Sequence, residues 1–589
     1  MDEKYTWDLT EFYKSDEEFY ADIDKIKELV EKVKRFRGTF KDDLSNVAAC
    51  FRELEELDRI FEIVSSYASF GYHQDMSDTS RLKKYKMVES LATTFSEATS
   101  YISPELSKLD DSVLEELANR EDMTEYKLEI KDIIKFKKHI LSEEVEEVVA
   151  KFSEVFGTPE NVFDLLTNTE FKYENVKDSS GKEYEMNEAL YSIYIKSNDE
   201  ELRRNAFQVL FNKYKSHINS ITELYLSIVK ESSISCKLRH YESSLDAATQ
   251  GDDSNINVYN TLVREVNKNL SLNHEYLALK AKMLGKDKVH MYDVYTNTLV
   301  PEDDKVEYEE AKEIVKKALS VLGDDYVEQL QYAFDHRWID VYKTENKMSG
   351  GYSAGVHPMH PFILLNYVNS SRDVSTLAHE LGHTMHSFYS NNAQNIFNAN
   401  YTIMVAEVAS TVNEILLANY QIDHEEDKMK KAALINEQLD MIRATLIRQT
   451  MFAEFEEIIH DKVSKGESLT SDNLCDEYYE LVKKYFGDPT ICDEEIKYEW
   501  ARIPHFYRCF YVYKYATGIT SAIVIASNIL AHKEGYVEKY KHMLSLGRTL
   551  ESLDLLRLVD VDLEKEETYE KAFDYYRENL RKLEELLNS

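Results

Sequence analysis

Hydrophobic residues recur every three or four positions along most of the chain, and this period predicts amphipathic helices. In the segment 16–36, the apolar stripe consists of Phe19, Ile23, Ile26, Leu29 and Val33. Similar stripes run through 45–69, 80–102, 111–120, 188–285, 301–334 and from 373 to the C-terminus. Only 16 Gly and 7 Pro interrupt the 589 residues. Long helices with short connections are therefore expected.

Two segments depart from the helical period. In 169–186, Phe171 and Tyr173 alternate with polar residues before an Asp-Ser-Ser-Gly turn, which predicts a β-hairpin. In 337–368, RWIDVYKT alternates in polarity and PFILLNYV is almost continuously apolar, which is typical of a buried strand. We therefore expect a mainly α fold with a small β-sheet just before residue 373. Taking the hairpin as a boundary divides the chain into an N-terminal helical lobe, 1–190, and a second domain, 191–589.

Composition narrows the class of protein. The formal net charge of −38 argues against partners such as nucleic acid or an anionic membrane, because both require clustered positive charge. No apolar run approaches the ~18 residues that a membrane-spanning helix needs. The five cysteines show no CxxC pair, and the N-terminus, MDEKYTWDLT, has no apolar core that would indicate a secretory signal. These features favour a cytoplasmic protein, and none indicates an oligomeric state.

The candidate chemistry lies in His379-Glu380-Leu381-Gly382-His383. On a helix, residues four apart lie on the same face, about 6 Å apart along the axis, so both imidazoles can bind one metal ion. Glu380 can then reach a water molecule on that metal without being a ligand, as in HExxH zinc hydrolases.

A helical projection supports an open catalytic face. His379, His383 and His386 fall on one side, and the bulky residues Leu377, Leu381 and Phe388 fall on the opposite side. Gly382 lies beside the metal-binding face, where we expect its missing side chain to leave room for a substrate.

A hydrolytic zinc site takes three protein ligands and keeps one position open. His386 is on the correct face, but it lies a further turn along the helix. The other candidate is in YTIMVAEVASTVNEILLANYQ (401–421), where a helix aligns Glu407, Ser410, Thr411 and Glu414 against an otherwise apolar surface. Buried carboxylates need a partner, and a cation supplies it. We favour Glu407 over His386 as the third ligand, with Glu414 and Ser410 orienting a ligand imidazole.

These motifs resemble the oligoendopeptidase F family, bacterial relatives of thimet oligopeptidase. The resemblance rests on HELGHTMHS and on AEVAST, whose Glu follows the second His by 24 residues. It extends to CKLRHYESSLDAA (236–248), WIDVYKTENKMSGGYSAG (338–355) and PHFYRCFYVYKYATG (504–518). It implies an almost all-helical fold of two lobes that enclose a deep substrate channel with zinc at its floor. Such a channel admits short unstructured peptides and excludes folded proteins.

Carried over by position, the resemblance implies one Zn²⁺ ion bound by His379, His383 and Glu407, with Glu380 as the general base. In the family, an imidazole and tyrosine hydroxyls from the region of 504–518 stabilise the oxyanion and hold the peptide backbone. The resemblance implies that His505 is this imidazole. For the tyrosine that stabilises the oxyanion, Tyr511 is the first candidate and Tyr507 the second. Substrate contacts are expected from Tyr507 and Tyr513.

A glycine-rich loop precedes the predicted buried strand. We expect Gly350, Gly351 and Tyr352, with the strand after them, to offer backbone groups to an extended peptide as an added strand. Glycine allows the close approach that this requires.

The sequence thus predicts a zinc-dependent endopeptidase that hydrolyses internal bonds of short unstructured oligopeptides, with 191–589 as its catalytic domain. Two alternatives stay open, a peptide-binding protein with an inactive site and a zinc carboxypeptidase that acts on chain ends.

Overall fold

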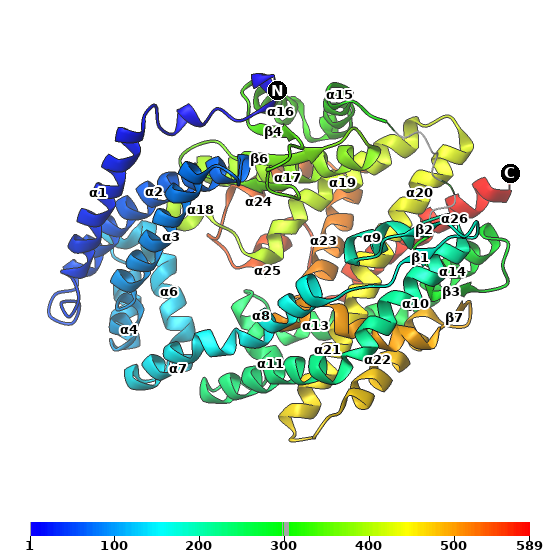
Figure 1. Cartoon of the computed structure of the whole chain (residues 1–589). Helices are drawn as coiled ribbons and strands as arrows, with labels where there is room; N and C mark the ends of the chain where they lie inside the picture. The colour runs from blue at the N-terminus through cyan, green and yellow to red at the C-terminus, as the bar shows by residue number, and fades with distance from the viewer. Residues whose placement is uncertain (1, 297–298, 300–304, 589) are drawn as a thin grey trace. The chain divides into compact units, whose positions relative to one another are not determined.

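The structure is a computed structural model that describes residues 2–296, 299 and 305–588 (Figure 1). It is mainly helical with only short strands, as the hydrophobic pattern predicts. Among the described residues, no helix is both long and apolar enough to cross a membrane.

The chain forms two compact units built from interleaved segments. The first unit contains Met1–Glu143, Asp303–Tyr420 and Ile525–Asp560, and the second contains Glu144–Glu302, Gln421–Val524 and Val561–Ser589. These units differ from the two contiguous domains expected from the sequence, 1–190 and 191–589. That division into domains stays a prediction. The channel between two lobes also stays a prediction.

The N-terminal part of the first unit is a helical core. Its helices are α1 (Asp16–Lys34), α2 (Ser45–Gln74), α3 (Thr79–Thr99), α4 (Ile102–Ser107), α5 (Asp111–Ala118) and α6 (Lys127–Phe136). Ser15 caps α1 by accepting a hydrogen bond from the backbone N–H of Glu18. The predicted stripe from Phe19 to Val33 is buried in α1 and packs into one cluster with α2 and α3.

The rest of the first unit surrounds a three-stranded sheet. Its helices are α15 (Tyr308–Leu319), α16 (Asp324–Asp335), α17 (Ser371–Ala393), α18 (Ile396–Ala399), α24 (Tyr536–Ser545), α25 (Ser552–Leu558) and most of α19 (Ile403–His424). The strand order is β4 (Ile339–Tyr342), β6 (Phe362–Tyr367) and β5 (Tyr352–Ala354), with β6 parallel to β4 and antiparallel to β5. The predicted buried strand is therefore confirmed as the central strand β6, and it leads directly into α17.

The N-terminal residues cover one face of this sheet. Trp7 and Phe70 form a buried cluster with Val356, Phe362 and Leu364. The indole N–H of Trp7 also donates a hydrogen bond of 3.0 Å to the backbone carbonyl of Trp338. The first residues of the chain therefore help to build the sheet that precedes α17.

The second unit is also helical. It contains α8 (Thr158–Leu165), α9 (Glu188–Tyr194), α10 (Glu200–Ser216), α11 (Ile218–Leu238), α12 (Ser244–Gly251), α13 (Ile256–Lys268), α14 (Leu270–Met283), α20 (Lys428–Ile442), α21 (Arg448–Ser464), α22 (Ser471–Phe486) and α26 (Glu566–Asn588). Three helices run across the division between the units, α7 (Glu143–Phe156), α19 and α23 (Tyr513–Leu530). The predicted hairpin is confirmed, because β1 (Val176–Lys177) pairs antiparallel with β2 (Glu183–Tyr184). A second two-stranded pair joins β3 (Val289–His290) to β7 (Thr490–Ile491).

Candidate active site

The HExxH sequence lies in the middle of α17. Ser370 caps the helix in a reciprocal capping box with Asp373, which fixes where the helix begins. Leu377 and Leu381 are fully buried on the back of the helix. The imidazoles of His379 and His383 are partly exposed, with 25% and 17% of their side-chain surface accessible. The helix therefore packs by its apolar face and leaves its imidazoles accessible, as the projection predicts.

The second helix of the site, α19, crosses α17 at very close range. A Cβ atom on Gly382 would lie 2.5 Å from the Cα atom of Ser410 and 2.6 Å from the carbonyl oxygen of Ala409. The expectation that Gly382 leaves room for a substrate was therefore wrong, because the backbone of α19 fills that space. Asn413 of α19 also donates a buried hydrogen bond to the carbonyl of Ala378.

This crossing brings three metal-binding side chains together. The ligand atoms of His379, His383 and Glu407 all lie within 4.8 Å of one another. The two Nε2 atoms are 3.2 Å apart, and Oε2 of Glu407 lies 3.7 Å from Nε2 of His379 and 3.8 Å from Nε2 of His383. A circle through the three atoms has a radius of about 2.1 Å, which matches the zinc bond lengths of about 2.0–2.2 Å to nitrogen and oxygen.

The hydrogen bonds around the imidazoles suit the same interpretation. Nδ1 of His379 pairs with a carboxylate oxygen of Glu414, the contact expected from the alignment on 401–421. The ring of His383 hydrogen-bonds to the backbone of Ala406. Because Nδ1 of His379 is engaged by Glu414, its Nε2 atom is the one that faces Nε2 of His383 and the carboxylate of Glu407. Three electron-pair donors that converge in this way fit a divalent cation.

His386, the other ligand candidate, is not part of this cluster. Its imidazole is 2% exposed and stacks on the ring of Tyr401, with ring centroids 3.6 Å apart. The extra helical turn between His383 and His386 therefore directs His386 into the core.

Burial and neighbouring charges shift the pKa values of the site. Burial opposes the charged form of His379, but the hydrogen bond and negative charge of Glu414 outweigh it and raise the pKa of His379 to about 9. Burial and the adjacent His379 lower the pKa of His383 to about 3. Burial raises the pKa of Glu380 to about 7, with the charges of Glu407 and Glu414 adding to the effect and that of His379 opposing it.

The glycine-rich loop lies against the catalytic helix. Gly350 has a left-handed backbone with φ of +87°. A Cβ atom on Gly351 would lie 3.6 Å from Oε1 of Glu380, so the backbone passes close to that carboxylate. The next residue begins β5, which is an edge strand of the sheet. The hydroxyl of Tyr352 hydrogen-bonds to Nδ1 of His73 at 2.8 Å, so this side chain faces the N-terminal helices.

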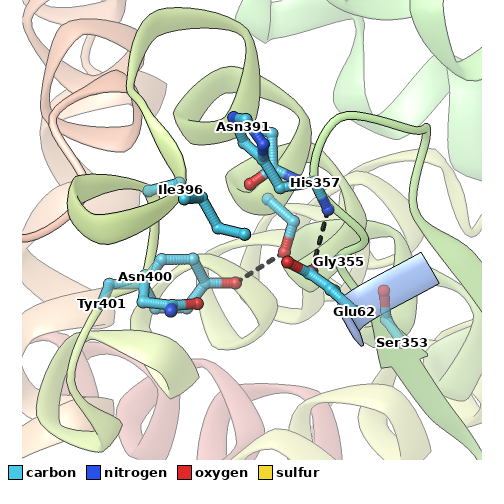
Figure 2. Close-up of a pocket in the computed structure, with 10 residues that line it drawn as sticks. Glu62, Ser353, Gly355, His357, Asn391, Ile396, Asn400 and Tyr401 are labelled. Carbon is cyan, nitrogen blue, oxygen red and sulfur yellow. Dashed lines mark hydrogen bonds between the residues drawn. The ribbon is translucent and has the colours of Figure 1, made fainter. Parts of the chain in front are cut away.

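A polar pocket of about 230 Å³ opens beside α17 within the first unit (Figure 2). Ser387 and Tyr401 line it and share a hydrogen bond of 2.9 Å between their hydroxyls. Glu62 of α2 also lines it and accepts a 2.8 Å hydrogen bond from the backbone N–H of His357. Burial raises the pKa of Glu62 to about 7, although that hydrogen bond opposes the shift.

Sequence reasoning did not single out Glu62. It lies in the N-terminal third of the chain, in a helix whose periodicity indicates only a scaffold. Glu62 accepts its hydrogen bond from the backbone of His357, which lies 295 residues further along the chain. No local sequence pattern connects two residues so far apart.

The predicted residues from 504–518 form a second cluster, in the second unit. Nε2 of His505 lies 3.2 Å from the hydroxyl of Tyr515, and the ring of Tyr511 lies against both rings, with centroids 5.7 and 5.5 Å away. Tyr507 is 7% exposed, stacks on Phe163 and has a buried hydroxyl without a hydrogen-bond partner.

Tyr513 belongs to the interior of the same unit. Its side chain is fully buried, and its hydroxyl donates a hydrogen bond of 3.0 Å to Asp252. The roles assigned to His505 and to the tyrosines stay predictions.

Helices α17 and α19 thus form a candidate metal centre of the HExxH type on a mainly helical scaffold. The family model of Peptidase family M3 matches residues 193–575, and that of Oligopeptidase F matches residues 105–173. The chain therefore belongs to peptidase family M3, within its oligoendopeptidase F group, and is a metallopeptidase.

Individual relatives are similar to this protein over nearly its full length. Oligopeptidase PepF of Bacillus subtilis is 36% identical over 99% of this chain and 87% of its own. A crystal structure of a protein from Chlamydophila abortus has a TM-score of 0.93 and 30% identity, covering 100% of this chain and 99% of its own. The crystal structure of oligoendopeptidase-F from Enterococcus faecium has a TM-score of 0.75 and 29% identity, covering 97% and 99%.

Proposed function

We propose that the protein is a zinc-dependent endopeptidase that hydrolyses internal bonds of short unstructured oligopeptides. The observation that carries this proposal is the convergence of His379, His383 and Glu407 beside the carboxylate of Glu380. The three donors would hold one Zn²⁺ ion, because two imidazoles and one carboxylate form a common ligand set of catalytic zinc. When bound, zinc supplies Lewis-acid chemistry that activates water and polarises the scissile carbonyl.

Glu380 acts as the general base in this proposal. Its carboxylate takes a proton from the attacking water and passes it to the leaving amine. Burial favours this role, because it raises the pKa of Glu380 and so makes its carboxylate a stronger proton acceptor. Glu414 holds the ring of His379 with its Nδ1 proton directed away from the centre.

The edge strand β5 binds the peptide in this proposal. An extended substrate adds as a further strand along Gly350, Gly351 and Tyr352, and the backbone of Gly351 places its scissile bond near Glu380. His505 and Tyr511 stabilise the oxyanion in this proposal, and the resemblance to the oligoendopeptidase F family supports these two roles. The substrate contacts predicted for Tyr507 and Tyr513 are not part of it, because both side chains are buried.

The relatives' names support oligopeptides as the substrate class, because the Bacillus subtilis relative is an oligopeptidase. The five cysteines are all free thiols, which supports a reducing, cytoplasmic setting.

A doubly blocked fluorogenic peptide tests the reaction. We expect cleavage at an internal bond, loss of activity with a chelator and recovery when Zn²⁺ is added. A carboxypeptidase would leave a peptide with blocked ends intact, and a peptide-binding protein would bind it without turnover. Mass spectrometry of the products distinguishes these outcomes.

The variant Glu380→Gln tests the general base. It should keep about one equivalent of zinc in elemental analysis while kcat falls by about 10²–10⁴-fold. Glu407→Gln is the matched control, since it should lose zinc as well as activity. If Glu380→Gln turned over peptide at the wild-type rate, the assignment of the base would be wrong.

A further inference from the structure

A second group of side chains that could bind a metal ion lies in the second unit. Glu456 and His460 are four residues apart on α21, and Cys509 follows the short helical turn Pro504–Tyr507. The ligand atoms of these three residues lie within 4.8 Å of one another. Glu456 is 0% exposed and His460 is 4% exposed, so the cluster is part of the interior.

Most nitrogen and oxygen atoms of this cluster have no hydrogen-bond partner among the residues that the structure describes. Oε1 of Glu456 accepts a 2.6 Å hydrogen bond from the backbone N–H of Phe510, but its Oε2 has none. Both ring nitrogens of His460 are also without a partner. A neutral imidazole carries one N–H donor and one acceptor nitrogen, and leaving both unsatisfied in the interior is unfavourable.

The described surroundings supply no hydrogen bond to Oε2 of Glu456 or to the ring of His460, although Ser232 hydrogen-bonds to the thiol of Cys509. One face of His460 lies against the ring of Phe510, with centroids 4.6 Å apart. The nearby ammonium group of Lys514 is paired with Asp252 at 2.8 Å. The hydroxyl of Tyr225, whose phenol interacts electrostatically with Glu456 and Cys509, is likewise buried without a partner.

A cation would bind one ring nitrogen of His460, a carboxylate oxygen of Glu456 and the sulfur of Cys509. Ligand atoms around a tetrahedral zinc ion are about 3.3–3.8 Å apart, a spacing that is too long for good direct hydrogen bonds and within the limits of this cluster. We propose that Glu456, His460 and Cys509 form a second metal site, which binds Zn²⁺ or another thiophilic divalent cation. A thiolate with an imidazole and a carboxylate selects such ions over Mg²⁺ or Ca²⁺.

The site has a structural consequence in the second unit. The metal joins α21 to the segment 504–512, which carries His505 and Tyr511 on either side of Cys509. The metal therefore links that segment to α21 by coordination bonds, in addition to the apolar packing of Phe510. The proposal does not depend on the proposed function, because its ligands differ from those of the HExxH centre.

Cobalt provides a direct test, because the second site alone contains a thiolate. The full-length protein is stripped with a chelator and titrated with Co²⁺. We expect two equivalents to bind and a thiolate-to-cobalt charge-transfer band to develop in the near ultraviolet. The variant Cys509→Ser should lose this band and one equivalent of cobalt. The matched control is Cys492→Ser, which removes another partly buried thiol of the same unit and should keep the band and both equivalents.

The variant His383→Ala separates the two sites. It should lose one equivalent of metal and its peptidase activity but keep the thiolate band. In this variant a chelator should still lower the thermal midpoint, because the second site remains loaded. One equivalent of cobalt and no thiolate band in the wild-type protein would overturn the proposal, and a water molecule would then occupy the cluster. The wild-type spectrum decides the question even if Cys509→Ser fails to fold.

Discussion

At the residue scale, the metal centre depends on a position that carries no functional group. Gly382 allows the backbones of α17 and α19 to approach so closely that the donors on the two helices meet. Any side chain there would separate His383 from Glu407, whose ligand atoms are 3.8 Å apart. The missing Cβ atom therefore serves helix packing rather than substrate access.

Gly382→Ala should destabilise the protein. Its Cβ would meet the backbone at 2.5–2.8 Å, where no side-chain rotation can relieve the contact. Overpacking of this kind typically costs about 1–3 kcal/mol. We expect a lower midpoint of denaturant unfolding together with weaker zinc binding. Gly251→Ala is the matched control, because no atom lies within 4 Å of its added Cβ. Equal midpoints for the two variants would contradict the close crossing.

The variant Glu414→Gln tests whether Glu414 positions the imidazole of His379. The carboxylate holds the imidazole of His379 without being part of the three-donor cluster. Loss of such a partner usually weakens metal binding by about 10–100-fold. Competition with a chromogenic chelator should show this loss, whereas Glu426→Gln, an exposed site just beyond α19, should bind like the wild type. An unchanged affinity in Glu414→Gln would remove the positioning role.

At the element scale, side chains from distant helices complete the surroundings of α17. The carboxylate of Glu62 on α2 accepts a hydrogen bond from the backbone of His357, in the loop between β5 and β6. Burial raises the pKa of Glu62 to about 7 from its ordinary value of 4.5. The folded protein therefore binds this proton more tightly than the unfolded chain does.

Glu62→Gln should change how stability depends on pH. Below about pH 4.5 the carboxyl is protonated in both states and contributes no difference, whereas stability is lost as pH rises through about 7. The amide keeps the hydrogen-bond acceptor and cannot ionise. At pH 8 the variant should therefore be more stable than the wild type by about 2–3 kcal/mol, a gain that disappears towards pH 4.5.

Urea unfolding at pH 5 and pH 8 measures this effect. Glu28→Gln serves as the control, because Glu28 is exposed on α1. A stability difference that stays the same at both pH values would mean that burial of Glu62 does not set its ionisation.

At the scale of the whole molecule, each compact unit combines segments from several parts of the chain. The first unit depends on this arrangement, since Trp7 and Phe70 cover Val356, Phe362 and Leu364 of the sheet region. A backbone hydrogen bond of 2.9 Å also joins the N–H of Met76 to the carbonyl of Asn346. The sheet that precedes α17 is therefore incomplete without the N-terminal third.

A chain of residues 191–589 should not fold into an active protein by itself. Its central strand would expose apolar side chains that are otherwise fully buried. We expect loss of near-ultraviolet circular dichroism and rapid proteolysis, with activity partly restored when residues 1–190 are expressed as a separate chain. Cooperative unfolding and normal activity of 191–589 alone would show instead that the N-terminal part is dispensable.

Much of this organisation could be predicted because it depends on local periodicity. The helical stripe of α1, the hairpin at β1 and β2, and the buried strand β6 follow from spacing within a few residues. The grouping of His379 and His383 also follows from helical geometry alone. The acidic alignment on 401–421 indicated that Glu414 and Ser410 orient an imidazole; Glu414 does contact His379, whereas the hydroxyl of Ser410 hydrogen-bonds to Glu407.

What the sequence determined by itself, therefore, is the helical class of the protein, the strand before α17 and the placement of His379 and His383 on one helical face. These features depend on residues a few positions apart, whose relative placement the backbone geometry dictates. Only the tertiary structure decided that Gly382 accommodates a neighbouring helix, that Glu62 reaches His357 and that Cys509 meets Glu456 and His460. Those contacts join elements far apart in the sequence, and packing between elements, which no local period encodes, brings them together.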